Sequence, residues 1–124
     1  MQKMLLIGAL ALSLPVSSFA NQLAFPECAS DHKVNYLLSK ANDYYEQGNY
    51  KFAYICLRHS ASQNDADSQF YIASFYQNGL PGVITQDLYE AGYWMNTAAF
   101  NGSKDAINHI KKQKEELAKI LGSL

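Results

Sequence analysis

Two cysteines, Cys28 and Cys56, have the clearest potential for chemistry in this 124-residue chain. An even number of cysteines in an exported protein is typical of a disulfide, which here would tie the segment before the first helix to the second helix. Such a bridge would stabilise the fold by roughly 3 to 4 kcal/mol on a chain-entropy model. Two buried free thiols are the alternative. A third interpretation makes Cys56 a nucleophile with His59 as its base, although no third orienting group can be identified.

Other side chains that often carry chemistry lack partners at recognised spacings. His32, His59 and His109 are too far apart in the sequence to form a metal motif, so we expect neither a metal nor another cofactor. Ser30 and Lys33 match the S-x-x-K element of penicillin-recognising enzymes, but no S-D-N or K-T-G element accompanies them. Helix capping accounts for the serine equally well, and we assign no catalytic residue.

The first 20 residues have the three parts of a secretory signal peptide. Lys3 supplies a positive start, residues 4–14 are apolar, and Ser18-Phe19-Ala20 is a small-x-small cleavage site. The apolar stretch is too short to cross a bilayer. We therefore expect cleavage after Ala20, a periplasmic or secreted product without a transmembrane span, and an irregular N-terminal segment over residues 21–30.

Composition and charge narrow the classes of protein to which the chain can belong. Hydrophobic residues make up 48% of the sequence against 17% charged residues, so the chain can bury a core and is not intrinsically disordered. The formal net charge is −1, whereas a surface that binds a phosphate backbone needs an excess of positive charge. We expect a single domain and no nucleic-acid partner.

Apolar side chains recur at spacings of three and four residues throughout residues 31–124, which predicts an all-α fold without strands. Ser30 or Asp31 would cap the first helix, and Gly48 would end it in a left-handed conformation. A second helix starts at Tyr50 and leads to a turn at residues 63–65.

Capping residues also mark the later helices. A third helix is expected over residues 66–78, and Asp65 and Asp67 at its start favour capping and the helix dipole over a paired-carboxylate site. Residues 80–86 contain Pro and Gly and are expected to form a loop that covers no core and tolerates change. Asp87 would cap a fourth helix.

The last predicted helix starts at Ser103 and would cap the end of the fold. Its apolar stripe is expected to face the core, and it consists of Ile107, Ile110, Leu117 and Leu121. Lysines and glutamates on the opposite side would face water. They make this end of the chain net positive, which could orient a partner.

An internal repeat becomes visible when the sequence is compared with itself. Seven positions align at a shift of 38 residues: Cys56, Ser60, Ala61, Asn64, Ser68, Ile72 and Tyr76 with Trp94, Ala98, Ala99, Gly102, Ala106, Ile110 and Lys114. Gly48 and Gly79 align at a shorter shift of 31 residues. The insertion at residues 80–86 accounts for the difference between the two shifts. The pattern predicts a short α-solenoid of two helix-hairpin repeats plus a C-terminal capping helix.

The region from Leu37 to Ile110 resembles the Sel-like repeat family, a subclass of tetratricopeptide-like solenoids. The resemblance is carried by Ala61, Ile72, Ala73, Tyr76, Gly79, Gly82, Val83, Asp87, Ala91, Trp94, Ala98, Ala99, Gly102 and Ala106. Ala73 falls on the family frame but has alanine in place of glycine, and the chain also departs from the family pattern at Asn64, Ser68 and Glu90. The resemblance implies an adaptor or binding scaffold, common in bacterial envelopes, that holds partners along the inner face of a curved stack. It implies no shared reaction.

The aromatic residues indicate where binding would occur. The chain has nine tyrosines, six phenylalanines and one tryptophan, more than a two-repeat core needs. Three of them, Tyr45, Tyr76 and Trp94, occupy positions that the repeat pattern uses for packing. Two sets of three residues align at the 31-residue shift and would line the concave side: Lys40, Tyr44 and Gln47 with Tyr71, Phe75 and Asn78. The alternative is that Tyr44 and Phe75 only fill the groove between repeats.

We therefore expect an exported, non-enzymatic module that binds another protein through this concave aromatic face and is a monomer when free. An envelope adaptor is one setting. A periplasmic immunity-type protein, which neutralises a toxic effector, is the other, and short exported members of the resembled family have that role. A cell-wall or β-lactam hydrolase is the alternative from a different class, although no nucleophile, base and oxyanion site is complete.

Overall fold

The computed structural model describes residues 26–124, and the expected signal peptide and residues 21–25 lie outside this described part. The described residues are all-helical, as the sequence predicts. A short 3-10 helix, η2 (Pro26–Cys28), precedes the α-helices α2 (Val34–Glu46), α3 (Tyr50–Ser62), α4 (Ala66–Asn78), α5 (Leu88–Phe100) and α6 (Lys104–Gly122). Within residues 26–124 the only β-type pairing is an isolated bridge between Leu80 and Ile84.

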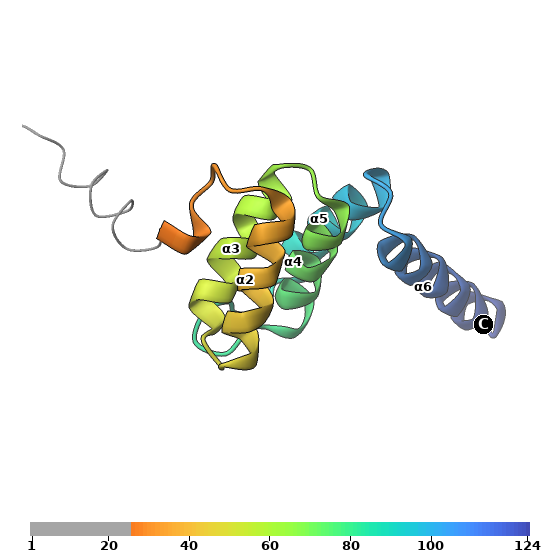
Figure 1. Cartoon of the computed structure of the whole chain (residues 1–124). Coiled ribbons are helices and arrows are strands. Elements are labelled where there is room, and N and C mark those ends of the chain that lie inside the picture. The colour runs from red at the N-terminus through yellow and green to blue at the C-terminus, as the bar shows by residue number, and fades with distance from the viewer. Residues whose placement is uncertain (1–25) are drawn as a thin grey trace, which may run out of the picture.

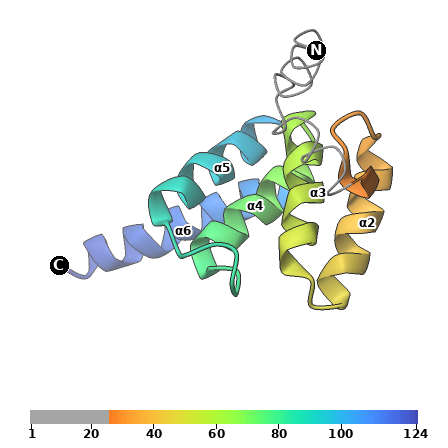
Figure 2. The ribbon, with the colours of Figure 1, turned by 90° about the vertical axis from the view of Figure 1, so that its left-hand side faces the viewer.

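Neighbouring helices pack side by side along the chain. Helix α2 packs on α3 and α4 packs on α5, which makes two hairpins, and α3 lies against α4 where the hairpins meet (Figure 2). The start of α6 contacts α5 and α4, whereas its C-terminal part projects away from the other helices (Figure 1). The all-α fold is thus confirmed, while its classification as a solenoid stays a prediction.

Buried side chains form two core groups. The first joins η2, α2, α3 and α4, and consists of Cys28, Leu37, Ala41, Cys56, Leu57, Ala61 and Ile72. The second joins α4, α5 and α6, and consists of Ala73, Met95, Ala98 and Ala106. Trp94 of α5 packs against both groups, so this one side chain links the two hairpins.

Three helices begin with side-chain caps at or next to the positions where the sequence predicts their starts. The side chains of Asp65, Asp87 and Ser103 accept hydrogen bonds from backbone N–H groups in the first turns of α4, α5 and α6. The Asp65 carboxylate, for example, accepts from the N–H of Ser68 at 2.8 Å. These bonds satisfy amides that would otherwise have no partner at a helix start, and they confirm that Asp65 is a capping residue.

The start of α2 differs from the prediction, because neither Ser30 nor Asp31 caps it and no side chain does. Both residues lie in the turn between η2 and α2. The side-chain amide of Gln63, at the end of α3, donates to the carbonyl oxygen of His32 at 2.8 Å. A contact from a distant helix therefore holds this turn in place of a local cap.

The connection between α4 and α5 also differs from the prediction. Gly79 and Gly82 have positive φ angles of 78° and 71°, and Leu80 and Ile84 exchange two backbone hydrogen bonds of 2.8 and 2.9 Å. This tight turn directs Leu80 inward, where it is only 4% exposed. The expectation that residues 80–86 cover no core is wrong.

Helix α6 departs most from the expectation. Ala106 is buried and Ile110 is half-buried, but every residue beyond Ile110 is exposed. Three residues of the predicted core stripe are largely exposed: Ile107 (46%), Leu117 (55%) and Leu121 (59%). The expectation that the whole stripe faces the core is wrong, because only the start of α6 packs on α4 and α5 and the rest of the helix projects away from them (Figure 1).

The ends of the two hairpins have the same backbone geometry. Asn64 and Gly102, which align at the 38-residue shift, both have positive φ, at 65° and 97°. Asparagine is one of the few residues besides glycine that tolerates this conformation. Ser60 and Ala98, also aligned, are both fully buried. Each hairpin therefore leads into the next helix in the same way.

Candidate functional site

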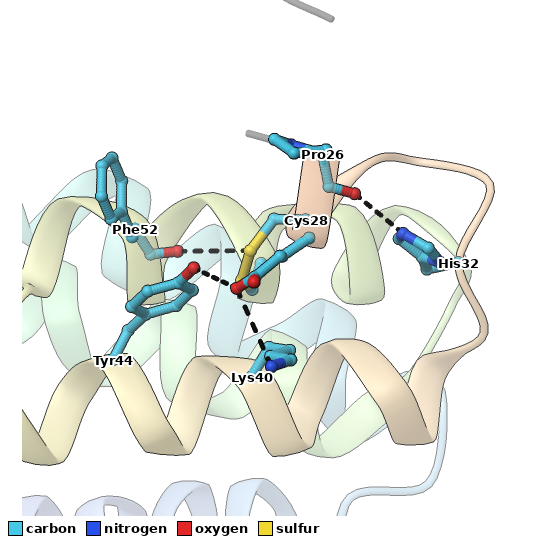
Figure 3. The surroundings of a disulfide bond; sticks show 8 residues. Pro26, Cys28, His32, Lys40, Tyr44 and Phe52 are labelled. Carbon is cyan, nitrogen blue, oxygen red and sulfur yellow. Dashed lines mark hydrogen bonds and ion pairs between the residues drawn. A yellow bond between two sulfur atoms is a disulfide. The ribbon is translucent and has the colours of Figure 1, made fainter. Parts of the chain in front are cut away.

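Cys28 and Cys56 form a disulfide between η2 and α3, as the sequence predicts. Their Cα atoms are 4.7 Å apart, and both residues are almost fully buried. The Cys28 sulfur lies 3.9 Å from the carbonyl oxygen of Phe52, a packing contact because a disulfide sulfur carries no proton to donate (Figure 3). With both sulfurs bonded to each other, Cys56 has no thiolate to act as a nucleophile with His59.

Glu27, beside the disulfide, connects η2 to α2. Its carboxylate accepts a hydrogen bond from the Tyr44 hydroxyl and lies 3.8 Å from the Lys40 ammonium (Figure 3). The hydrogen bond to Glu27 raises the pKa of Tyr44, because the protonated phenol is the form that donates. The Tyr44 ring also meets Phe52 edge to face, with ring centroids 5.3 Å apart. Lys40 and Tyr44 thus hold the N-terminal segment against α2.

A groove of about 520 Å³ lies between α2 and α4, with α3 at its base. It is lined by Leu38, Ala41, Asn42 and Tyr45 of α2, Leu57 of α3, and Asp67, Tyr71 and Phe75 of α4. Tyr45 stacks on Phe75 across the groove, with centroids 6.1 Å apart and ring planes at 13°. Tyr45 and Tyr71 are 47% and 49% exposed. The groove is therefore apolar at its base and carries two accessible tyrosine side chains.

The six residues predicted to bind a partner lie in three different places. Tyr71 and Phe75 line the groove, Lys40 and Tyr44 contact Glu27, and Gln47 and Asn78 are exposed at the C-terminal ends of α2 and α4. The prediction puts Tyr44 on one concave side with Tyr71 and Phe75. In the structure Tyr45 lines the groove with them, whereas Tyr44 contacts Glu27 of η2.

The α2 wall of the groove was not identified from the sequence. Leu38, Asn42 and Tyr45 follow the same i, i+4, i+7 spacing that selected Lys40, Tyr44 and Gln47, but on a neighbouring face. The spacing is visible in the sequence. What distinguishes the two faces is the position of η2, which only the folded chain reveals.

A second group of aromatic side chains lies on the outer face of α5. Tyr89, Tyr93 and Phe100 are 86%, 60% and 91% exposed. Tyr93 packs edge to face against Trp94, with centroids 5.6 Å apart. This outer face offers matched controls for experiments on the groove.

The described residues contain no cluster of three or more His, Cys, Asp or Glu side chains that could hold a metal ion. His32 places its Nε2 atom 2.9 Å from the carbonyl oxygen of Pro26 and packs against Tyr36 (Figure 3). This histidine has a structural role at the turn before α2. Ser30 and Lys33 of the S-x-x-K match are exposed on either side of it.

Comparisons with protein-family models, curated proteins and solved structures yield no match to this chain. The resemblance to Sel-like repeats accordingly stays a prediction, and the functional argument depends on the geometry of the groove. The disulfide fits an oxidising compartment. Between Pro26 and Leu124, no helix combines the length and the hydropathy that a membrane span requires.

Proposed function

We propose that this protein is an exported, non-enzymatic binding module that takes a segment of a partner protein into the groove between α2 and α4. The observation that carries the proposal is the pair of half-exposed tyrosines, Tyr45 and Tyr71, above an apolar base. Tyrosine supplies a large contact area, loses little conformational entropy and offers a hydroxyl, which is why it is enriched at binding hot spots.

The lining of the groove indicates what kind of segment it would take. Among the lining residues Asp67 alone carries a charge, and Asn42 adds an amide on the opposite wall. An apolar or aromatic side chain of the partner would enter between Tyr45 and Tyr71. A lysine or arginine next to it would pair with the Asp67 carboxylate.

Export rests on the predicted signal peptide and is supported by the disulfide, which is typical of oxidising compartments. A periplasmic or secreted location follows. The partner would then be an envelope protein, if the chain is an adaptor, or a toxic effector, if it is an immunity-type protein. Both settings use the same groove.

Selection from a random-peptide display library on the oxidised protein tests the proposal. We expect selected peptides to pair an aromatic residue with a lysine or arginine. Tyr71→Ala should weaken their binding by at least about 30-fold, or about 2 kcal/mol, in isothermal titration. Asp67→Asn should weaken binding mainly at low salt, because a partly exposed ion pair is screened by added ions.

Two control variants separate binding from folding. Tyr93→Ala, on the outer face of α5, should leave peptide binding unchanged. Tyr76→Ala should lower the melting temperature, because Tyr76 packs against the first core group, whereas Tyr71→Ala should change it little. The proposal is wrong if no peptide is selected, or if Tyr93→Ala abolishes binding while Tyr71→Ala does not.

A further inference from the structure

Two carboxylates border the groove between α2 and α4, one toward each end. Asp67 lines the groove in the first turn of α4, and Glu46 is the last residue of α2. Glu46 accepts a hydrogen bond of 3.3 Å from the side-chain amide of Asn42, which also lines the groove. Both acidic residues are exposed. The groove therefore carries a negative charge near each of its ends.

Positive charge on the two wall helices does not balance these carboxylates. Helix α4 contains no lysine, arginine or histidine, and Lys40 is the only such residue of α2. Its ammonium forms the only ion pair within residues 26–124, and the partner there is Glu27. A segment that enters the groove thus meets two carboxylates without a cationic partner. Charge complementarity favours a segment with two positive side chains.

Helix geometry gives the separation of the two carboxylates along the groove. Two short turns reverse the chain between α2 and α4, so both helices run in the same direction. The stack of Tyr45 on Phe75 shows which levels of the two helices coincide. Asp67 precedes Phe75 by two turns, and Glu46 follows Tyr45 directly. At 1.5 Å per residue, the two acidic residues are about 13 Å apart along the groove.

An extended peptide repeats its side chains at the spacing of this groove. Alternate residues of a strand project from one side and are about 6.6 Å apart. Asp67 and Tyr71 lie one turn apart on α4, about 6 Å along its axis. A basic residue opposite Asp67 therefore places the next side chain of the same side beside Tyr71. The side chain after that, about 13 Å from the first, comes beside Glu46.

The width of the groove favours an extended segment over a helix. Where Tyr45 stacks on Phe75, the ring centroids are 6.1 Å apart, so the two walls meet there. A helix with its side chains is at least about 10 Å across. An extended chain is narrower and can direct its central side chain between the walls, toward Leu57 at the base.

We propose that the occupant of the groove is an extended basic segment of the partner protein with the pattern B-x-Φ-x-B, in which B is lysine or arginine and Φ is an aromatic or large apolar residue. The two basic side chains pair with Asp67 and Glu46, and the central side chain packs beside Tyr71. The pattern reads the same in both directions, so the charges set the register of the segment and not its polarity. The proposal rests on the function proposed above and specifies the ligand.

Fluorescence anisotropy with labelled, end-blocked peptides tests the pattern on the oxidised protein, with serine at each x and at about 0.05 M salt so that ion pairs are little screened. R-x-F-x-R should bind at least about fivefold more tightly than Q-x-F-x-Q, because each exposed ion pair contributes modestly. It should also bind more tightly than R-R-F-x-x, which has the same composition and the wrong spacing.

Variants of the two carboxylates locate the contacts. Asp67→Asn and Glu46→Gln should each weaken binding of R-x-F-x-R by about two- to fivefold. The matched control Asp43→Asn removes the same charge from α2 outside the groove lining and should have a smaller effect. In the double variant of Asp67→Asn and Glu46→Gln, R-x-F-x-R and Q-x-F-x-Q should bind equally, because the arginines have lost their partners.

The results distinguish failure of this proposal from failure of the proposed function. If Q-x-F-x-Q binds as tightly as R-x-F-x-R and Tyr71→Ala weakens both, the groove binds segments regardless of charge, and only the basic pattern is overturned. Equal binding of R-x-F-x-R and R-R-F-x-x overturns the pattern as well, and so does an Asp43→Asn effect equal to that of Asp67→Asn. If Tyr71→Ala weakens none of the peptides, both proposals are wrong.

Discussion

In the first hairpin, Cys56 of α3 is bonded to Cys28, whereas the aligned position of the second hairpin holds Trp94, whose ring packs against both core groups. The guanidinium of Arg58 lies 5.0 Å from the centroid of the Trp94 ring. A covalent bond thus ties the N-terminal segment to the first hairpin, and a large aromatic side chain links the second hairpin to the first. The covalent attachment needs an oxidising environment, and the aromatic contact does not.

Removal of the disulfide should have the largest effect. Cys28→Ser combined with Cys56→Ser should lower the free energy of unfolding by roughly 3 to 4 kcal/mol and the melting temperature by roughly 10 °C or more. Hydrogen exchange should show faster opening of α2 than of α4 and α5, because the bridge holds only the first hairpin. Equal acceleration in both hairpins would contradict the comparison.

Truncation of the tryptophan should come next. Trp94→Ala should cost about 3 kcal/mol, since it removes contacts to both core groups. Its neighbour Tyr93 is 60% exposed, so Tyr93→Ala should change stability by less than about 0.5 kcal/mol. Urea unfolding of both variants measures the difference, and similar losses would mean that Trp94 does not link the hairpins.

Substitution of the buried residue in the turn between α4 and α5 should lower stability more than a substitution in a variable loop would. Leu80 is buried, so Leu80→Ala should cost about 2 kcal/mol, while Thr85→Ala at an exposed position should be neutral. Thermal melts of the two variants test this. A neutral Leu80→Ala would restore the expectation that residues 80–86 contribute nothing to the core.

The hydrogen bond between the hairpins should have the smallest effect. The hydroxyls of Tyr54 and Tyr76 are 3.2 Å apart, and Tyr54→Phe should cost about 1 kcal/mol. Burial, and then this hydrogen bond, raise the pKa of Tyr54 above its ordinary value of 10.0. The folded state therefore favours the neutral phenol, and the stability that this provides is complete below pH 10 and is lost as pH rises further.

Tyr54→Phe should accordingly flatten the alkaline decline in stability. Urea unfolding of the wild type and the variant between neutral and strongly alkaline pH measures this slope. An identical decline in both proteins would assign the effect to other tyrosines.

Short-range sequence signals predicted the helix starts and the disulfide. Asp65, Asp87 and Ser103 bond to amides two or three residues away, so the starts of α4, α5 and α6 were predictable. The disulfide followed from the even cysteine count and the export signal. Neither prediction required knowledge of how helices pack.

Features decided by packing were not predictable in this way. Tyr44 and Tyr45 have the same residue type and adjacent positions, yet Tyr45 stacks on Phe75 of α4 and Tyr44 bonds to Glu27 of η2. Likewise, the stripe of α6 has the pattern of a core helix. Its exposure follows from the direction in which α6 projects away from α4 and α5 (Figure 1), and the periodicity of α6 does not reveal that direction.

The most direct test of the binding groove is a titration of isotope-labelled protein with a display-selected peptide, followed by amide chemical shifts in NMR spectra. The account predicts the largest shifts at Asn42, Tyr45, Tyr71 and neighbouring groove residues, and small shifts along the outer face of α5. Largest shifts at Tyr89 and Tyr93, with the groove residues unmoved, would contradict it.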